Sequence, residues 1–378
     1  MRALPSSSKT MAPAPTDKIA VSSTGEVFHL QIPPAELSRP LSIVALGGGT
    51  GLSTLLRGLR ILVGELESRE LAGLEAELSA IVTVTDDGGS SGRLRRDFDM
   101  LAPGDIRNCM VALAEDEALL SKLFRYRFEA GEGLEGHSFG NLFLTALSHV
   151  TGDFHQAIRL SSEVLAIRGQ IFPSTLSNVT LEAQLQSGRS MVGESSITGC
   201  RDGIKRIHLR PRSAPPAPGA LNAIAGADLI TLGPGSLYTS VIPNLLIDGV
   251  AEAIAQSPAL KVYICNLMWE PGETEDYSAE DHVQAVLEHS VPGLIDLVVV
   301  NNKAISASAR KRYAKQNAFP VELDEARLRK LVPEVLAMDL VAKGLPLRHD
   351  ADRLARVLLV KAQESRARRV GAEKVNPG

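Results

Sequence analysis

The chain has 378 residues, of which 44% are hydrophobic and 22% charged, as expected for one large α/β domain with additions or for two medium domains. A formal net charge of −4 and an aromatic content of 4% argue against nucleic acid as a partner, because basic surface and stacking rings are both scarce. No apolar run is long enough to span a bilayer, and the first segment lacks the apolar centre of a secretory signal, so we expect a cytoplasmic protein without a membrane span.

The cysteines indicate the same compartment. Cys109, Cys200 and Cys265 lie far apart and have neither CxxC nor zinc-type spacing. Each lies in or beside a run of apolar or small residues, which is typical of reduced, buried thiols in the cytosol.

The two ends of the chain differ from the middle. Residues 1–40 are rich in Pro, Ser and Ala and are predicted to form a flexible extension, with a weak strand pattern at Ile19–Ser22 and Val27–Ile32 that would add an edge hairpin. Residues 363–378 are predicted to form a basic tail. The nucleotide-binding domain is therefore expected to span residues 41–362.

The first strong strand, Ser42–Leu46, runs into the glycine-rich turn Gly47–Gly51, and a helical pattern follows over Leu52–Leu78. Glycines allow backbone N–H groups to approach an anion, and the helix start adds free N–H groups and a positive dipole end. The predicted phosphate contacts are Gly48, Gly49, Thr50 and Gly51, although a plain tight turn is the simpler alternative. The dinucleotide fingerprint fails because Leu52 stands at its third glycine position, and a Walker A loop would need a lysine.

The second predicted strand, Ala80–Thr85, ends in two acids followed by small residues and arginines. Asp86 and Asp87 can hold Mg²⁺, bind a ribose or orient the arginines. The hydroxyl, N–H and guanidinium groups that follow suit a phosphate; they belong to Gly89, Ser90, Ser91 and Arg93. An Asx turn followed by a helix cap remains the alternative.

An α+β insertion is predicted over residues 100–218. It contains helical patterns at Asp105–Phe128 and Asn141–Ile167, a hairpin of Asn178–Gln186 with Met191–Thr198, and a strand at Arg206–Arg210.

Two polar clusters precede the helices of this insertion. Asp105 is placed to cap the first helix, and Arg107 and Asn108 then fall in its first turn, where a ligand would meet them. His137 can act as an acid or base, and Asn141 can contact a base or sugar. His137 lies in a polar cluster flanked by glycines. The histidines that lack such flanking glycines are interpreted as structural: His149, His155 and His289.

Three further strands are predicted at Ala227–Leu232, Lys261–Leu267 and Asp296–Asn301. The first of them runs into Gly-Pro-Gly-Ser, a second phosphate-type loop that contains Gly233, Gly235 and Ser236. Helices are predicted at Ala279–Glu288, Leu328–Leu340 and Ala351–Lys361. The pattern predicts an α/β fold, Rossmann-like and doubly wound, with a mainly parallel sheet, the insertion, and C-terminal helices.

Six motifs in this order resemble the gluconeogenesis factor family of bacteria, which is related to 2-phospho-L-lactate transferase of deazaflavin cofactor synthesis. The resemblance covers about residues 41–360 and rests on Gly47-Gly-Gly-Thr-Gly51, Thr85-Asp-Asp-Gly-Gly-Ser-Ser-Gly92, Pro103-Gly-Asp-Ile-Arg-Asn108, Gly136-His-x-x-Gly-Asn141, Gly233-Pro-Gly-Ser-Leu-Tyr-Thr-Ser240 and Pro271-Gly-Glu-Thr274.

The resemblance implies a cytoplasmic, Rossmann-like protein tied to cell shape and cell-wall precursor supply during gluconeogenic growth. Such proteins bind UDP-sugars such as UDP-N-acetylglucosamine without established turnover, whereas the transferase relatives use a guanosine nucleotide and Mg²⁺. By motif, Gly48–Gly51 and Gly233–Ser236 would face the phosphates, and Asp86 and Asp87 would stand at the metal-linked acids of the transferases. Asn266 and Tyr277 would meet the sugar or base. Trp269-Glu270 departs from the Thr-Gln of the family pattern, which puts sugar or base specificity in doubt.

Two hypotheses follow. The first is a non-catalytic regulator that binds a nucleotide-sugar, requires no cofactor, forms a homo-oligomer and acts on a protein partner in carbon or cell-wall metabolism. The second is a Mg²⁺-dependent transferase for a nucleoside triphosphate and a phosphorylated hydroxy acid, with Asp86, Asp87 and His137 as its catalytic residues. The failed glycine fingerprint argues against an NAD-type oxidoreductase.

Overall fold

The computed structural model of the chain describes residues 20–21, 27–28, 39–68, 75–115 and 119–375. Most of the predicted flexible extension therefore lies outside the described residues. Within it, β1 (Ala20–Val21) and β2 (Val27–Phe28) pair antiparallel as a separate two-stranded sheet, so the expected hairpin forms but does not join the edge of the main sheet.

The centre of the fold is a seven-stranded sheet in the order β12-β11-β10-β9-β3-β4-β5, and every neighbouring pair in it is parallel. The order reverses between β3 and β9, which is the arrangement of a doubly wound α/β fold. The strands are β3 (Leu41–Gly47), β4 (Ala76–Val82), β5 (Gln170–Pro173), β9 (Leu229–Leu232), β10 (Leu260–Ile264), β11 (Leu297–Asn301) and β12 (Glu334–Met338).

All five predicted core strands are present, with shifted ends. β4 begins at Ala76, so the helical pattern expected through Leu78 was too long; α1 (Gly49–Ser68) ends ten residues earlier. The helix predicted at Leu328–Leu340 was wrong, because this segment contains the edge strand β12, paired in parallel with β11.

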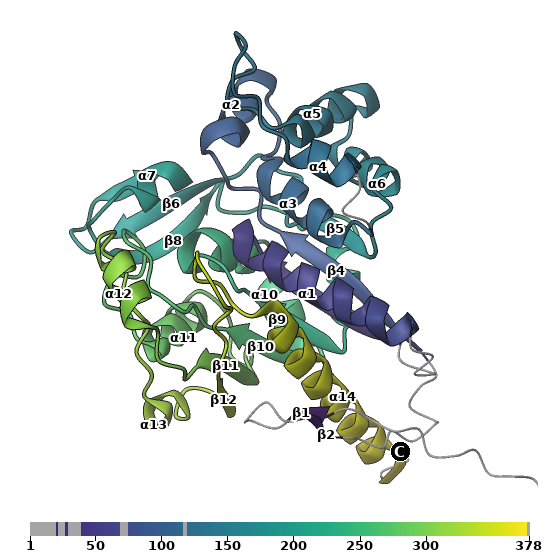
Figure 1. The fold of residues 1–378 in the computed structure, drawn as a ribbon, viewed down its shortest axis with the longest axis vertical. Helices are drawn as coiled ribbons and strands as arrows, with labels where there is room; N and C mark the ends of the chain where they lie inside the picture. Colours follow the sequence, from purple (N-terminus) through teal and green to yellow (C-terminus); the bar gives the residue numbers. More distant parts are fainter. Residues whose placement is uncertain (1–19, 22–26, 29–38, 69–74, 116–118, 376–378) are drawn as a thin grey trace, which may run out of the picture.

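Helices cover both faces of the sheet. α1 lies side by side with α14 (Ala351–Val375) over one face, while α10 (Val250–Gln256) lies behind the sheet (Figure 1). Residues 363–375, assigned to a basic tail from the sequence, are therefore helical. Between residues 220 and 328, the helices besides α10 are α8 (Ala220–Ala225), the π-helix η2 (Leu237–Val241), α9 (Ile242–Leu245), α11 (Ala279–Glu288), α12 (Ala307–Ala314) and α13 (Glu325–Leu328).

The predicted insertion divides into two parts. The first part is a helical crossover that leads to β5 and so belongs to the main sheet: α3 (Gly104–Leu113), α4 (Leu119–Arg125), α5 (Phe139–Thr151) and α6 (Phe154–Val164). The short helix α2 (Gly89–Phe98) precedes it. The second part is an antiparallel sheet in the order β7-β6-β8, formed by β6 (Thr180–Leu185), β7 (Ser190–Val192) and β8 (Ile204–Arg210). The predicted second hairpin strand is shorter than expected, because α7 (Glu194–Thr198) takes its last residues.

A buried carboxylate fastens α14 to the start of the sheet. Asp228, which precedes β9, is fully buried and accepts two hydrogen bonds of 2.8 Å from the Arg39 guanidinium. Arg369 of α14 donates a third, also at 2.8 Å, and Arg366 lies at 3.8 Å. Three arginines from both ends of the domain thus neutralise one acid that would be costly to bury alone.

No single helix in the described ranges is long and apolar enough to cross a membrane, although the bent pair Leu237–Leu245 and Val250–Gln256 passes by length and composition. The three cysteines are unpaired; Cys109 and Cys265 are buried, and Cys200 is half-buried.

Candidate functional site

The two glycine loops predicted from the sequence meet at the point where the strand order reverses. Gly51, in the first turn of α1, packs so closely on the second loop that a Cβ atom there would lie 2.3 Å from the Pro234 carbonyl oxygen. The Asn244 amide donates to the carbonyl of Gly47 at 3.2 Å and to that of Ser240 at 2.8 Å. The loops are therefore one rigid unit, as a two-loop clamp requires.

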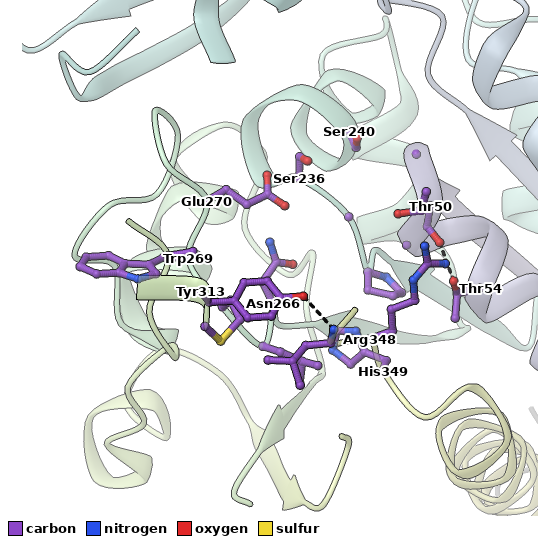
Figure 2. A pocket seen from close by; sticks show the side chains of 18 of the residues that line it. Thr50, Thr54, Ser236, Ser240, Asn266, Trp269, Glu270, Tyr313, Arg348 and His349 are labelled. Carbon is purple, nitrogen blue, oxygen red and sulfur yellow. Dashed lines mark hydrogen bonds between the residues drawn. The ribbon is translucent and has the colours of Figure 1, made fainter. Parts of the chain in front are cut away.

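A cavity of about 350 Å³ opens beside this unit (Figure 2). Seven of the predicted contact residues line it: Gly48, Gly49, Thr50, Gly51, Gly235, Ser236 and Asn266. The sequence-derived pairing of the two loops around one space is thus present, and Gly233 lies outside the lining.

The far wall of the cavity comes from segments that sequence reasoning missed. Tyr313 and Gln316 contribute from the end of α12 onward, and Leu347, Arg348 and His349 from the loop before α14. The Tyr313 hydroxyl accepts a hydrogen bond of 2.8 Å from the Leu347 N–H, which fixes the two segments to each other. No glycine loop or strand end marks these residues, so the sequence carried no local signal for them.

Charge is unevenly placed around the cavity. Figure 2 shows Arg348 on the side where Thr50 and Thr54 project, and Glu270 on the side of Ser236. His349 donates from Nε2 to the Cys265 carbonyl at 3.1 Å, and burial lowers its pKa to about 4, so this imidazole is neutral at pH 7. Among the described lining residues, Arg348 is thus the cationic side chain and Glu270 the acidic one, and burial raises the pKa of Glu270.

The remaining predicted residues gather in a second group, at the starts of α2, α3 and α5. Ser90 is hydrogen-bonded to His137 Nδ1 at 2.9 Å and accepts from the Asn141 amide at 3.1 Å. All three side chains are buried, and the Asn141 side-chain oxygen has no partner. Burial also lowers the pKa of His137, which favours the neutral ring.

Arginines of this second group bind the protein itself. Arg107 donates to the Ser138 hydroxyl at 2.5 Å and to Asn108 Oδ1 at 2.6 Å. Arg93 donates to the Glu135 carbonyl at 2.7 Å. The structure therefore separates the predicted contact residues into the glycine-loop cavity and this neighbouring polar group.

Asp86 and Asp87 point to different partners. Asp86 accepts from the Gly88 N–H at 2.9 Å, which is an Asx turn. Asp87 accepts from the N–H and hydroxyl of Ser195 at 2.8 and 2.6 Å, and so caps α7. In the part of the chain that the structure describes, no three His, Cys, Asp or Glu side chains are grouped to hold a metal ion, and the two predicted acids bond to separate protein groups.

Asp105 connects the two groups. It does not cap α3, whose N-cap is Pro103; instead its carboxyl group lies against the first glycine loop, where a Cβ atom added at Gly48 would lie 2.6 Å from Asp105 Oδ2. Burial raises the pKa of Asp105 to about 6, and Asp86 contributes to the rise. Burial likewise raises the pKa of Glu194 to about 7, with contributions from Asp86 and other nearby acids.

Tyr277 lies away from the cavity. Its hydroxyl is hydrogen-bonded to that of Tyr238 at 2.8 Å, and the two rings meet edge to face. The predicted sugar or base contact through Tyr277 would require this pair to separate. Asn266 is the member of the predicted sugar or base pair that lines the cavity.

Comparison with known proteins places these features in a family context. A family model described as 2-phospho-L-lactate transferase CofD matches residues 43–341. The chain is 45% identical to a gluconeogenesis factor of Halalkalibacterium halodurans over 319 residues, which is 84% of this chain and 95% of the relative. It is 43% identical to a gluconeogenesis factor of Bacillus subtilis over 318 residues, 84% of this chain and 96% of the relative.

A solved structure agrees with the fold. A crystal structure of a UPF0052 family member from Bacillus halodurans superposes with a TM-score of 0.80 at 44% identity, covering 85% of this chain and 99% of that chain.

Proposed function

The chain belongs to the 2-phospho-L-lactate transferase CofD family, and from this premise we propose that it binds a nucleoside diphosphate-sugar, such as UDP-N-acetylglucosamine, between its two glycine loops. The diphosphate contacts the loops, and the remainder of the ligand extends toward Asn266 and Glu270.

One observation carries this proposal: the cavity is built around the packed pair of glycine loops at the reversal of the strand order. Doubly wound folds bind ligands at this point. The first N–H groups of α1 have no partner within the helix and favour an anion, and Arg348 adds a positive charge to the lining. A volume of about 350 Å³ lies in the range of small-molecule sites.

The role we propose is regulation rather than catalysis. The Ser90–His137 pair is buried outside this cavity, and His349 within it bonds to a main-chain carbonyl. In this proposal the protein is cytoplasmic, senses the nucleotide-sugar and acts on a protein partner in cell-wall precursor supply and cell shape. The similarity to proteins named gluconeogenesis factors supports a role in carbon metabolism. A homo-oligomer is part of the same proposal.

The acids beside the glycine loop favour a second candidate, a transferase acting on a nucleoside triphosphate and a phosphorylated hydroxy acid. Asp86 adds to the rise in the pKa of both Asp105 and Glu194, and Asp105 adds to the rise at Glu194; carboxyl groups perturbed by their neighbours in this way are typical of functional sites. The description of the matching family model supports the same chemistry.

Titration calorimetry of the full chain with UDP-N-acetylglucosamine, GTP and NADP, each with and without Mg²⁺, tests both candidates. The regulator requires tight binding of the UDP-sugar with no product after prolonged incubation. Release of pyrophosphate from GTP in the presence of phospholactate and Mg²⁺ would establish the transferase instead. If no nucleotide binds, both candidates fail.

A further inference from the structure

Glu270 is a carboxylate in a cavity that otherwise suits phosphates. It follows β10 and lines the same space as both glycine loops. Figure 2 shows it beside Ser236, the last residue of the second loop. A phosphate placed against Glu270 would meet a like charge, so this side of the cavity must receive another part of the ligand.

The backbone of Glu270 is held in place by a short turn. Its N–H donates to the Thr274 hydroxyl at 2.8 Å, and its carbonyl accepts from the N–H groups of Glu273 and Thr274 at 3.0 and 2.9 Å. Thr274 is fully buried. The side chain of Glu270 therefore starts from a backbone position that is held in place, which favours a role in specificity.

The chemistry of a nucleotide limits what can reach Glu270. Ser236 belongs to the loop that contacts phosphate in the proposed function, and the group joined directly to a phosphate in a nucleotide-sugar is a sugar ring. A carboxylate has acceptor sites only, and two neighbouring ring hydroxyls offer it two donors. A base edge lies further from the phosphate, beyond the ribose.

We propose that Glu270 binds two adjacent hydroxyl groups of the sugar ring that is esterified to the bound phosphate, and so selects sugar-linked phosphates over free pyrophosphate. This inference rests on the proposed function and specifies the ligand class at the same site. The ring is either the ribose or the hexose of a nucleotide-sugar, since both present this chemistry.

The surroundings of Glu270 are consistent with such a contact. Burial raises the pKa of its carboxyl group, and the Ser236 hydroxyl opposes this rise. Two further hydroxyl donors from a ligand would favour the charged carboxylate in the same way. Asn266 on the same cavity wall supplies an amide that can bond to a ring oxygen or a third hydroxyl.

The test compares Glu270→Gln with Glu322→Gln, an exposed carboxylate outside the cavity lining, in the full chain. Calorimetry measures the affinity for UDP-glucose, UDP, 2′-deoxy-UDP and inorganic pyrophosphate. Glu270→Gln should weaken UDP-glucose binding about tenfold or more, because a charge-assisted hydrogen bond is lost, and should not weaken pyrophosphate binding, because a like charge is removed. Glu322→Gln should bind all four as the wild type does.

The ligand series identifies the ring. If the ribose is bound, UDP shows the same loss in Glu270→Gln, and 2′-deoxy-UDP binds the wild type weakly. If the hexose is bound, UDP is unaffected and UDP-glucose alone shows the loss. Equal or tighter binding of UDP-glucose to Glu270→Gln overturns the inference while leaving the proposed function intact. Failure of the wild type to bind any of the four ligands overturns both.

Discussion

Replacing Gly49 by alanine separates backbone strain from ligand contact in the first glycine loop. Gly49 has a φ angle of 61°, and a Cβ atom added there would meet only the Ser240 hydroxyl, at 3.7 Å. Because Gly49 lines the cavity, the methyl group would occupy space that the proposed phosphate needs. The left-handed conformation costs a non-glycine residue about 1–2 kcal/mol, so the protein should still fold.

The effect on binding should be larger than the effect on folding. A phosphate oxygen displaced from one backbone N–H loses a charge-assisted hydrogen bond worth about 1.5–3 kcal/mol. This corresponds to a Kd weakened about 10- to 150-fold for UDP-N-acetylglucosamine. Calorimetry measures the affinity, and urea unfolding measures the stability of the same samples.

Gly188 provides a matched control. It has a φ angle of 85° in the β6–β7 hairpin, and a Cβ atom there would meet nothing within 4 Å. Gly188→Ala should lose a similar amount of stability and keep the wild-type affinity. If Gly49→Ala also keeps the wild-type affinity, the first loop is only a turn and the reasoning is refuted.

Three further predictions concern stability. Gly51→Ala should lower Tm well beyond Gly49→Ala, because its Cβ would overlap the Pro234 backbone; equal Tm values in differential scanning calorimetry would show that the two loops do not pack as described. Asp228→Asn should cost about 3 kcal/mol in urea unfolding, since the guanidinium groups of Arg39 and Arg369 lose their carboxylate partner, and a loss below about 1 kcal/mol would contradict the buried ion cluster. Glu194 has a pKa raised from 4.5 to about 7, so its contribution to stability is full below pH 4.5 and is lost as the pH rises through 7. Glu194→Gln should therefore flatten the fall in unfolding free energy over this range, and an unchanged slope in parallel urea titrations would refute the assignment.

The sequence predicted those strands of the sheet that are buried on both faces. Strands such as Leu229–Leu232 are covered on both faces and read as continuous apolar runs. Edge strands lack this pattern: Glu334–Met338 is only partly buried, contains good helix formers, and becomes a strand through its pairing with β11. The four-residue β5 is likewise specified by its neighbour β4 rather than by its own composition.

The candidate site likewise contains residues that local sequence patterns predict and residues that only the tertiary structure brings to the cavity. The glycine loops were predictable because each carries its own strand, turn and helix start within ten residues. Arg348 and His349 were not, because they reach the cavity from a loop whose position depends on the docking of α14 and on hydrogen bonds to distant segments. Local spacing cannot indicate a contact such as that between His349 and the Cys265 carbonyl.

Asp105 shows why residue type and spacing can select a functional position and still assign it the wrong partner. Its place in the first turn of α3 predicted a helix cap, yet its carboxyl group lies against Gly48 of the glycine loop. A phosphate on that loop would add negative charge beside a carboxyl whose pKa is already about 6, and would raise this pKa further. Near pH 6 the bound phosphate would then favour protonated Asp105, whose pKa the negative charge of Asp86 also raises. Phosphate binding at the glycine loop should therefore be coupled to proton uptake at Asp105, and affinities measured from pH 5 to pH 8 test this.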